Sequence, residues 1–182
     1  MDDPLLAETL LDSQTVYAGR LIRVTVDTVR LPDGQQARRE IVRHPGAVAI
    51  LAVDGEQILF VRQYRHAVGE SLLELPAGKI EAGETPLATA QRELAEETGF
   101  QAATWTPLGR TIVSPGFTDE VIHLFRAQDL EPTTAGVPDA DEFLVVERLS
   151  RAEALAAVAA GRIVDAKTQA ALFLAGLSPA NR

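Results

Sequence analysis

Two turns of one short helix in this chain crowd like charges together. The segment from residue 78 to residue 100 reads GKIEAGETPLATAQRELAEETGF and places Arg92, Glu93, Glu96 and Glu97 near one another. Carboxylates spaced four residues apart on a helix repel one another by a few tenths of a kcal/mol when no cation lies between them. Either this face of the helix is simply solvated, or a cation belongs beside it.

A helical projection separates the four charged side chains into two pairs. The apolar residues of the helix form a buried stripe, and Glu93 and Glu97 lie side by side at its edge. Two carboxylates in that position resist joint ionisation unless a cation neutralises them, and oxygen-only ligation favours Mg²⁺ or Mn²⁺. Arg92 and Glu96 fall on the outward side, where a mutual ion pair or support of the inner carboxylates fits best. A solvated acidic face has the same spacing, so the helix alone leaves both interpretations open.

The composition limits which partners this helix could serve. The chain has 182 residues, of which 46% are hydrophobic, and its formal net charge is −9. This length and composition suit one domain with a small appendage, and the charge argues against a nucleic acid or an anionic membrane as the main partner. No cysteine occurs, the first residues are acidic, and no apolar run approaches the roughly 18 residues of a membrane span. We therefore expect a cytoplasmic protein without a leader or a membrane anchor.

The chain before the helix has the alternation that is typical of β-strands. Residues 17–43 predict a hairpin around the turn LPDG. Residues 47–53 and 57–65 predict a second antiparallel pair, joined by Asp54-Gly55. The first half of the chain is therefore expected to be a series of hairpins.

The helix itself has clear termini, and more strands and helices follow it. Thr85 suits the N-cap with Pro86 in the first turn, and Gly99 suits the C-terminal stop. The other predicted elements are strands at 71–78, 105–114, 120–130 and 142–149, and two helices capped by Ser150 and Asp165. A sheet made mainly from hairpins, with one helix inserted mid-chain and two at the end, predicts an α+β fold.

The segment around the helix resembles the Nudix box, because it matches that family's pattern at every defining position. The matching residues are Gly78, Glu84, Arg92-Glu93-Leu94, Glu96-Glu97 and Gly99-Phe100. A chance match in a chain of this length has a probability on the order of 10⁻⁸. The resemblance implies the Nudix fold, an α/β/α sandwich with a mixed β-sheet, at residues 46–182, preceded by a small antiparallel β-domain at residues 1–45. It also supplies the missing cation, because the Nudix helix holds divalent metals against a diphosphate.

Segments outside the box resemble the ADP-ribose pyrophosphatases. They are REIVRHPGAVAIL, VRQYRHAVGESLLELPAGKIE and SPGFTDEVIHLF, and the last contains Pro115, which matches a proline that these enzymes carry beyond the box. The resemblance implies hydrolysis of ADP-ribose to AMP and ribose 5-phosphate with Mg²⁺ or Mn²⁺, in a homodimer whose N-terminal β-domain is swapped. The alternatives are another nucleoside diphosphate derivative (a sugar nucleotide, FAD or a dinucleoside compound) and a non-catalytic ADP-ribose sensor. Sensors of this kind commonly lose box glutamates, which this chain keeps.

The same resemblance assigns roles around the metal. Glu93 and Glu97 become direct metal ligands, and the carbonyl of Ala77 becomes a backbone ligand. Glu96 holds ordered water. The helical projection adds Arg92, which we expect to support these carboxylates from the outward side of the helix. All five residues are therefore expected at one catalytic site.

The resemblance also implies residues that bind the substrate. They are Arg65 for the diphosphate, Glu120 near the terminal ribose, Pro115 in the loop beside the adenosine, and Arg39 or Glu40 reaching adenine from the partner chain. Phe117 lies in the same loop, where its ring is a candidate for stacking on the base, with packing inside the loop as the alternative. Each has a structural alternative. Arg65 can be an exposed strand residue, Pro115 part of an ordinary turn, and Arg39-Glu40 a charge pair that protects an edge strand.

The position of the general base departs from the pattern of the relatives. Many of them carry Asp-Glu-Asp-Glu-Phe before the final strand, and the first glutamate is the usual base. Here the loop has Ala140 at that place, flanked by Asp139, Asp141 and Glu142. We expect Glu142 to take the proton because it has the longest reach, with the two aspartates behind it. A solvated acidic loop without a catalytic role is the alternative.

Overall fold

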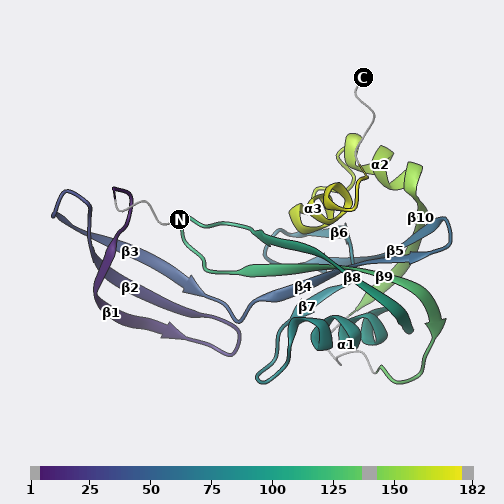
Figure 1. Cartoon of the computed structure of the whole chain (residues 1–182), viewed down its shortest axis with the longest axis horizontal. Helices are drawn as coiled ribbons and strands as arrows, with labels where there is room; N and C mark the ends of the chain where they lie inside the picture. Colours follow the sequence, from purple (N-terminus) through teal and green to yellow (C-terminus); the bar gives the residue numbers. More distant parts are fainter. Residues whose placement is uncertain (1–4, 137–142, 178–182) are drawn as a thin grey trace. The chain divides into compact units, whose positions relative to one another are not determined.

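The chain forms two compact units, and each is built on its own β-sheet (Figure 1). The computed structural model describes residues 5–136 and 143–177. One unit comprises the N-terminal strands up to Gly46 together with the segment Ile112–Glu120. The other unit comprises the rest of the chain and contains the predicted helix.

The N-terminal unit is built on a three-stranded antiparallel sheet in the order β1-β2-β3. Its strands are β1 (Thr9–Ala18), β2 (Arg23–Arg30) and β3 (Gln36–Arg43). Strand β2 buries every second residue, namely Thr25, Asp27 and Val29, so the alternation predicted the β2–β3 hairpin correctly. The prediction missed β1, because this strand is exposed along its whole length and has no buried face to impose a pattern.

The second unit contains a seven-stranded mixed sheet with the path β10-β5-β4-β9-β8, in which β6 pairs with β5 and β7 with β4. Its strands are β4 (Ala47–Asp54), β5 (Gln57–Arg65), β6 (Glu70–Glu74), β7 (Ala77–Lys79), β8 (Phe100–Ile112), β9 (Val121–Pro132) and β10 (Leu144–Ser150). Strands β4 and β9 run parallel, whereas β5 is antiparallel to β4, β6 and β10. The sheet is therefore mixed, as the resemblance implied.

The helices of the described residues cover both faces of this sheet. Helix α1 (Pro86–Thr98) lies on one face, and α2 (Arg151–Ala159) and α3 (Ala166–Leu174) lie on the other (Figure 1). Between α1 and the sheet lies a core whose members are fully buried, including Val48, Ile50, Leu59, Ala90 and Leu94. The layers are α/β/α, which confirms the expected architecture. Within the described ranges, no helix is long and apolar enough to cross a membrane.

The predicted helix termini are confirmed. Thr85 accepts a hydrogen bond from the first turn of α1, and Gly99 ends the helix in the left-handed conformation with φ 71°. Ser150 and Glu153 form a reciprocal capping box at α2. Asp165 caps α3 by accepting the N–H of its first turn. Local sequence signals therefore fix where all three of these helices begin.

Two details of the sheet differ from the prediction. Asp54 is still paired with Gln57, so the two-residue loop between β4 and β5 is Gly55-Glu56 rather than Asp54-Gly55. The strand predicted at 71–78 is divided into β6 and β7 around Pro76, which has no N–H to donate to a ladder. The short strand β7 that results carries the part of the chain that faces α1.

Candidate active site

Helix α1 carries two carboxylates on its buried side. Glu93 and Glu97 are only 6% and 4% exposed. Arg92 and Glu96 are partly exposed and form an ion pair one turn apart, with Nη1 and Oε2 separated by 2.8 Å. These positions match the helical projection, which placed the first pair inward and the second outward.

Strand β7 meets both buried carboxylates with its backbone. The N–H of Ala77 donates a hydrogen bond to Oε2 of Glu97 at 2.9 Å. At Gly78, an added Cβ would lie 1.9 Å from the Cδ and Oε1 atoms of Glu93. Only glycine therefore lets the Glu93 carboxylate lie against this strand, which gives a steric reason for the first residue of the box.

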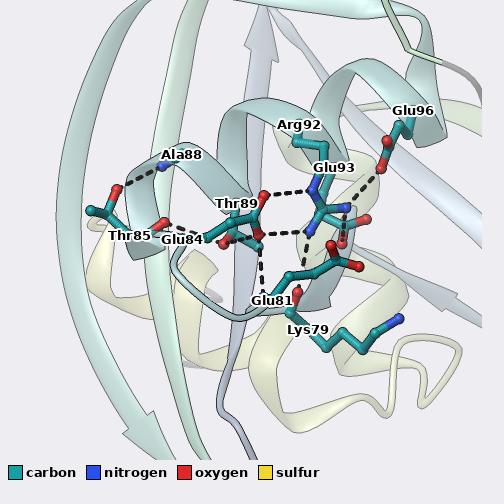
Figure 2. A network of polar contacts seen from close by, with 9 residues as sticks. All are labelled: Lys79, Glu81, Glu84, Thr85, Ala88, Thr89, Arg92, Glu93 and Glu96. Carbon is teal, nitrogen blue, oxygen red and sulfur yellow. Dashed lines mark hydrogen bonds and ion pairs between the residues drawn. The ribbon is translucent and has the colours of Figure 1, made fainter. Parts of the chain in front are cut away.

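Arg92 binds three carboxylates at once, as Figure 2 shows. Its Nε and Nη2 donate to the two oxygens of Glu84 at 2.9 and 3.0 Å. Its Nη1 donates to Glu93 and to Glu96, each at 2.8 Å. The guanidinium also reaches the carbonyl of Lys79 at 3.3 Å. Arg92 thus fixes the orientation of one buried and one outward carboxylate.

Glu84 connects the loop before α1 to the helix itself. Its Oε2 accepts hydrogen bonds from Thr89 Oγ1 at 2.8 Å and from the N–H of Glu81 at 3.2 Å (Figure 2). The hydrogen bonds from Arg92 are the main cause that lowers the pKa of Glu84 to about 2. The sequence marked Glu84 only as a box position, and its pairing with Arg92 was not predicted.

Arg65 is held by a carboxylate that the sequence reasoning did not single out. Its Nε and Nη2 donate to the two oxygens of Glu74 at 3.0 and 2.8 Å. Glu74 is 1% exposed, and Lys167 of α3 also binds it, at 2.5 Å. Hydrogen bonding to Glu74 raises the pKa of Arg65, against the effect of burial, and the charge of Glu97 adds to the rise. Arg65 is therefore a fixed guanidinium within the electrostatic reach of Glu97 on α1.

The loop residues proposed for the substrate lie in the N-terminal unit, on the segment Ile112–Glu120. The carbonyl of Phe117 accepts the N–H of Val42 at 2.7 Å, and Arg43 reaches Asp119 at 3.3 Å. The residue Phe117 is 54% exposed. Strand β3 thus holds this loop while leaving the aromatic side chain accessible. Pro115 and Glu120 lie on the same segment, and Glu120 is 3.6 Å from the imidazole of His44.

The remaining predicted residues fall on β3 and in the loop before β10. Arg39 forms an ion pair with Glu8 rather than with its neighbour Glu40, which is exposed. The adenine-binding role of these two residues stays a prediction. Glu142, the predicted general base, lies outside the described residues, as do Asp139 and Asp141.

The buried carboxylates fit a divalent cation by their chemistry. Across residues 5–136 and 143–177, no three His, Asp or Glu side chains form a complete metal site. Mg²⁺, however, usually keeps several waters and takes only one or two protein carboxylates. Glu93 and Glu97 are an oxygen-only donor pair of that kind, and the N–H of Ala77 holds one of them by donating to Glu97.

A comparison with protein-family models identifies this arrangement. The model of the NUDIX domain matches residues 42–170. The chain belongs to the NUDIX family. Helix α1 is therefore the Nudix helix, and β7 with the following loop is the start of the Nudix box. A second model, the nucleoside diphosphate sugar hydrolase N-terminal domain, matches residues 8–42, which cover β1, β2 and all of β3 except its last residue.

Curated relatives and a solved structure resemble this Nudix hydrolase over most of its length. The methanol dehydrogenase activator of Bacillus methanolicus is 45% identical over 167 residues, covering 90% of each chain. The ADP-ribose pyrophosphatase of Bacillus subtilis is 41% identical over 169 residues, covering 92% of this chain and 91% of the relative. A crystal structure of an ADP compounds hydrolase superposes with a TM-score of 0.84 at 26% identity, covering 96% of this chain and 95% of the other.

Proposed function

We propose that this Nudix hydrolase cleaves the pyrophosphate bond of ADP-ribose, giving AMP and ribose 5-phosphate. The observation that carries the proposal is the pair of buried carboxylates, Glu93 and Glu97, held against β7 at Ala77 and Gly78. The 41% identity to the ADP-ribose pyrophosphatase of Bacillus subtilis supports the choice of substrate.

The box residues would hold a divalent cation, Mg²⁺ or Mn²⁺, through Glu93, Glu97 and the carbonyl of Ala77. When bound, the cation neutralises charge on the diphosphate and lowers the pKa of an attacking water. Arg92 keeps Glu93 and Glu96 in place through its two 2.8 Å hydrogen bonds. Glu96 is thereby positioned to hold water, and the helix presents its carboxylates without further reorganisation.

Charged and aromatic side chains supply the substrate contacts in this proposal. Arg65 binds a diphosphate oxygen, since its guanidinium is fixed by Glu74 and 38% of its side chain remains exposed. Phe117 and Pro115 border the adenosine, and Glu120 lies near the terminal ribose. The exposed ring of Phe117 supports a contact with the base.

We propose a homodimer in which the N-terminal β-domain, residues 1–45, is swapped onto the partner's hydrolase domain, residues 46–182. Arg39 or Glu40 would then reach adenine in the partner's site. The exposed apolar side chains on β1 support an additional contact surface in this domain. The absence of cysteine supports a cytoplasmic location.

A panel of substrates tests the proposed activity. The purified protein with Mg²⁺ should have a higher kcat/KM for ADP-ribose than for ADP-glucose, GDP-mannose, NADH, FAD or diadenosine polyphosphates. Glu97→Gln is the matched control, because it preserves the shape of the side chain and should lose on the order of 10²-fold in kcat. A ten-fold preference for another compound in the panel would overturn the substrate while leaving the reaction class intact. Binding of ADP-ribose without turnover would indicate a sensor module.

The same assay tests Glu142 as the general base. Glu142→Gln should lower kcat at neutral pH, and the loss should shrink as the pH rises because hydroxide replaces the missing base. Asp139→Asn and Asp141→Asn serve as matched controls from the same loop. Equal rates in all three variants and in the wild type would contradict the assignment.

A second candidate function follows from the 45% identity to the methanol dehydrogenase activator. In that case the protein would raise the turnover of a methanol dehydrogenase. The test adds wild-type protein or Glu97→Gln to that dehydrogenase and follows its rate. Activation by the wild type but not by Glu97→Gln would show that activation requires hydrolysis. An unchanged dehydrogenase rate with both proteins would exclude this function.

A further inference from the structure

The first turn of α3 contacts the turn that leads into β7. Thr168 is fully buried, and its Oγ1 accepts a hydrogen bond from the N–H of Leu75 at 2.9 Å. The same hydroxyl donates to Oδ2 of Asp165, the N-cap of α3, at 2.6 Å. Thr168 therefore ties the start of this helix to a residue two positions before Ala77.

Each residue of the turn Leu75-Pro76-Ala77 is held by a hydrogen bond from or to another element. The N–H of Ala77 donates to Glu97 at 2.9 Å. The carbonyl of Pro76 accepts a hydrogen bond from β4, also at 2.9 Å. Leu75 is fully buried, so its N–H has no access to water and depends on Thr168 for a partner. The contact from α3 thus completes the support of the turn that meets the catalytic carboxylate.

Lys167, which precedes Thr168, forms an ion pair with Glu74, which precedes Leu75. Lys167 Nζ lies 2.5 Å from Oε2 of Glu74 and 3.0 Å from Oδ1 of Asp165. Burial alone would raise the pKa of Glu74, but hydrogen bonds from Arg65 and the charge of Lys167 outweigh burial and hold that pKa below its ordinary value. Glu74 is therefore an ionised bridge between α3 and Arg65.

We propose that the first turn of α3 is a positioning element of the Nudix site. Thr168 fixes the turn that places Ala77 against Glu97, and Lys167 fixes the guanidinium of Arg65 through Glu74. Thr168 reaches the site through Leu75 and Lys167 reaches it through Glu74, so each acts through another group. The inference rests on the proposed function and adds residues on the opposite face of the sheet from α1, far from the box in the sequence.

Removal of the Thr168 hydroxyl tests the first contact. Thr168→Val should weaken Mn²⁺ binding to the metal-free protein about 10-fold, because the turn that carries Ala77 loses its fixing hydrogen bond. Mn²⁺ binding is measured by electron paramagnetic resonance without substrate, and the Mg²⁺ concentration for half-maximal activity should rise in parallel. Thr168→Ser keeps the hydroxyl and should bind Mn²⁺ within about two-fold of the wild type.

Removal of the Lys167 charge tests the second contact. Lys167→Met should raise KM for ADP-ribose on the order of 10-fold with a smaller change in Mn²⁺ affinity, because Arg65 loses its fixed orientation. Lys167→Arg restores the charge and should recover most of the loss. This variant also carries the test if Thr168→Val does not fold.

Ser150→Ala is the matched control, because it removes a hydroxyl N-cap from α2, and the Ser150 hydroxyl exchanges its hydrogen bonds with Glu153 in the first turn of that helix. It should lower Tm without changing Mn²⁺ affinity or KM. Wild-type Mn²⁺ binding in Thr168→Val together with wild-type KM in Lys167→Met would overturn the proposal. An equal loss of Mn²⁺ binding in Ser150→Ala would overturn it as well, since the effect would then be general destabilisation. Because Mn²⁺ binding needs no substrate, failure of ADP-ribose hydrolysis leaves the comparison of Thr168→Val with Thr168→Ser standing, whereas the KM of Lys167→Met depends on that activity.

Discussion

The two buried carboxylates of the Nudix helix are held by different groups. Glu97 accepts a backbone N–H from Ala77, whereas Glu93 shares Oε1 with Arg92 and lies against the bare Cα of Gly78. Gly78 does not have a positive φ, so the backbone does not require glycine there. What requires it is the space taken by the Glu93 carboxylate.

Gly78→Ala should therefore act on catalysis rather than on folding. The added methyl group would displace the Glu93 carboxylate, since the two would lie 1.9 Å apart. We expect kcat/KM for ADP-ribose to fall on the order of 10- to 100-fold. We expect Tm to be unchanged or slightly raised, because alanine restricts the unfolded chain more than glycine does. Steady-state kinetics and thermal unfolding of the same preparation measure both.

A double-mutant cycle distinguishes this mechanism from a general effect of the methyl group. In a Glu93→Ala background, Gly78→Ala should cost little further activity, because no carboxylate remains to be displaced. Additive losses would show that the methyl group acts elsewhere, and normal turnover in Gly78→Ala alone would refute the steric argument.

At the scale of the elements, the sequence predicted the helix ends correctly, because a helix end depends on the residues next to it. Thr85, Gly99, Ser150 and Asp165 each satisfy backbone groups at a helix end, so their positions could be read from the sequence. Strand β1 could not be predicted, because its side chains are exposed and its pairing with β2 is set by the sheet rather than by its own pattern. Burial imposes a pattern, and exposed strands lack it.

The contacts of the site also divide into those that helix geometry predicts and those that only the tertiary fold creates. The inward position of Glu93 and Glu97 and the Arg92–Glu96 pair could be derived from helix geometry. The bond between Lys167 and Glu74 could not, because 93 residues separate them and only the tertiary fold brings α3 to β6. The two hydrogen bonds from Arg92 to Glu84 depend on the path of the loop before α1, and the secondary-structure propensities of the residues do not determine that path.

The Glu84–Arg92 contact between loop and helix predicts a pH-dependent contribution to stability. The pKa of Glu84 is about 2 in the folded chain, below the ordinary value of 4.5. Its contribution is therefore complete above about pH 5 and is lost as the pH falls from about 4.5 towards 2. Glu84→Gln should lower the free energy of unfolding at pH 7 on the order of 1 kcal/mol, and this difference should shrink in acid.

Urea unfolding at a series of pH values measures the difference between wild type and Glu84→Gln. In an Arg92→Met background the same substitution should show a much weaker dependence on pH, because the main cause of the low pKa is gone. A difference that stays constant from pH 7 to pH 3 would contradict the assigned role of the contact.

At the scale of the whole molecule, the N-terminal unit exposes apolar side chains that its own sheet does not cover. Leu10, Val16 and Tyr17 of β1 are 57%, 55% and 55% exposed. β1 is also an end strand of a three-stranded sheet, a size that gains limited stability by itself. Exposed apolar side chains on an end strand are typical of a surface that another chain covers. A second copy of this chain is the partner that the proposed function requires.

The protein should therefore be a dimer in solution, with a mass near twice the 19.6 kDa of one chain. Light scattering coupled to size exclusion measures it. The double variant Leu10→Asp and Val16→Asp should shift the mass towards that of one chain and lower kcat/KM for ADP-ribose, because Arg39 or Glu40 would no longer reach the partner's site. Phe173→Asp is the control, since Phe173 is 69% exposed on α3 and should tolerate a charge without change in mass or activity. A wild-type chain that is monomeric and fully active would exclude the shared site, and a monomeric double variant with normal kcat/KM would separate dimerisation from catalysis.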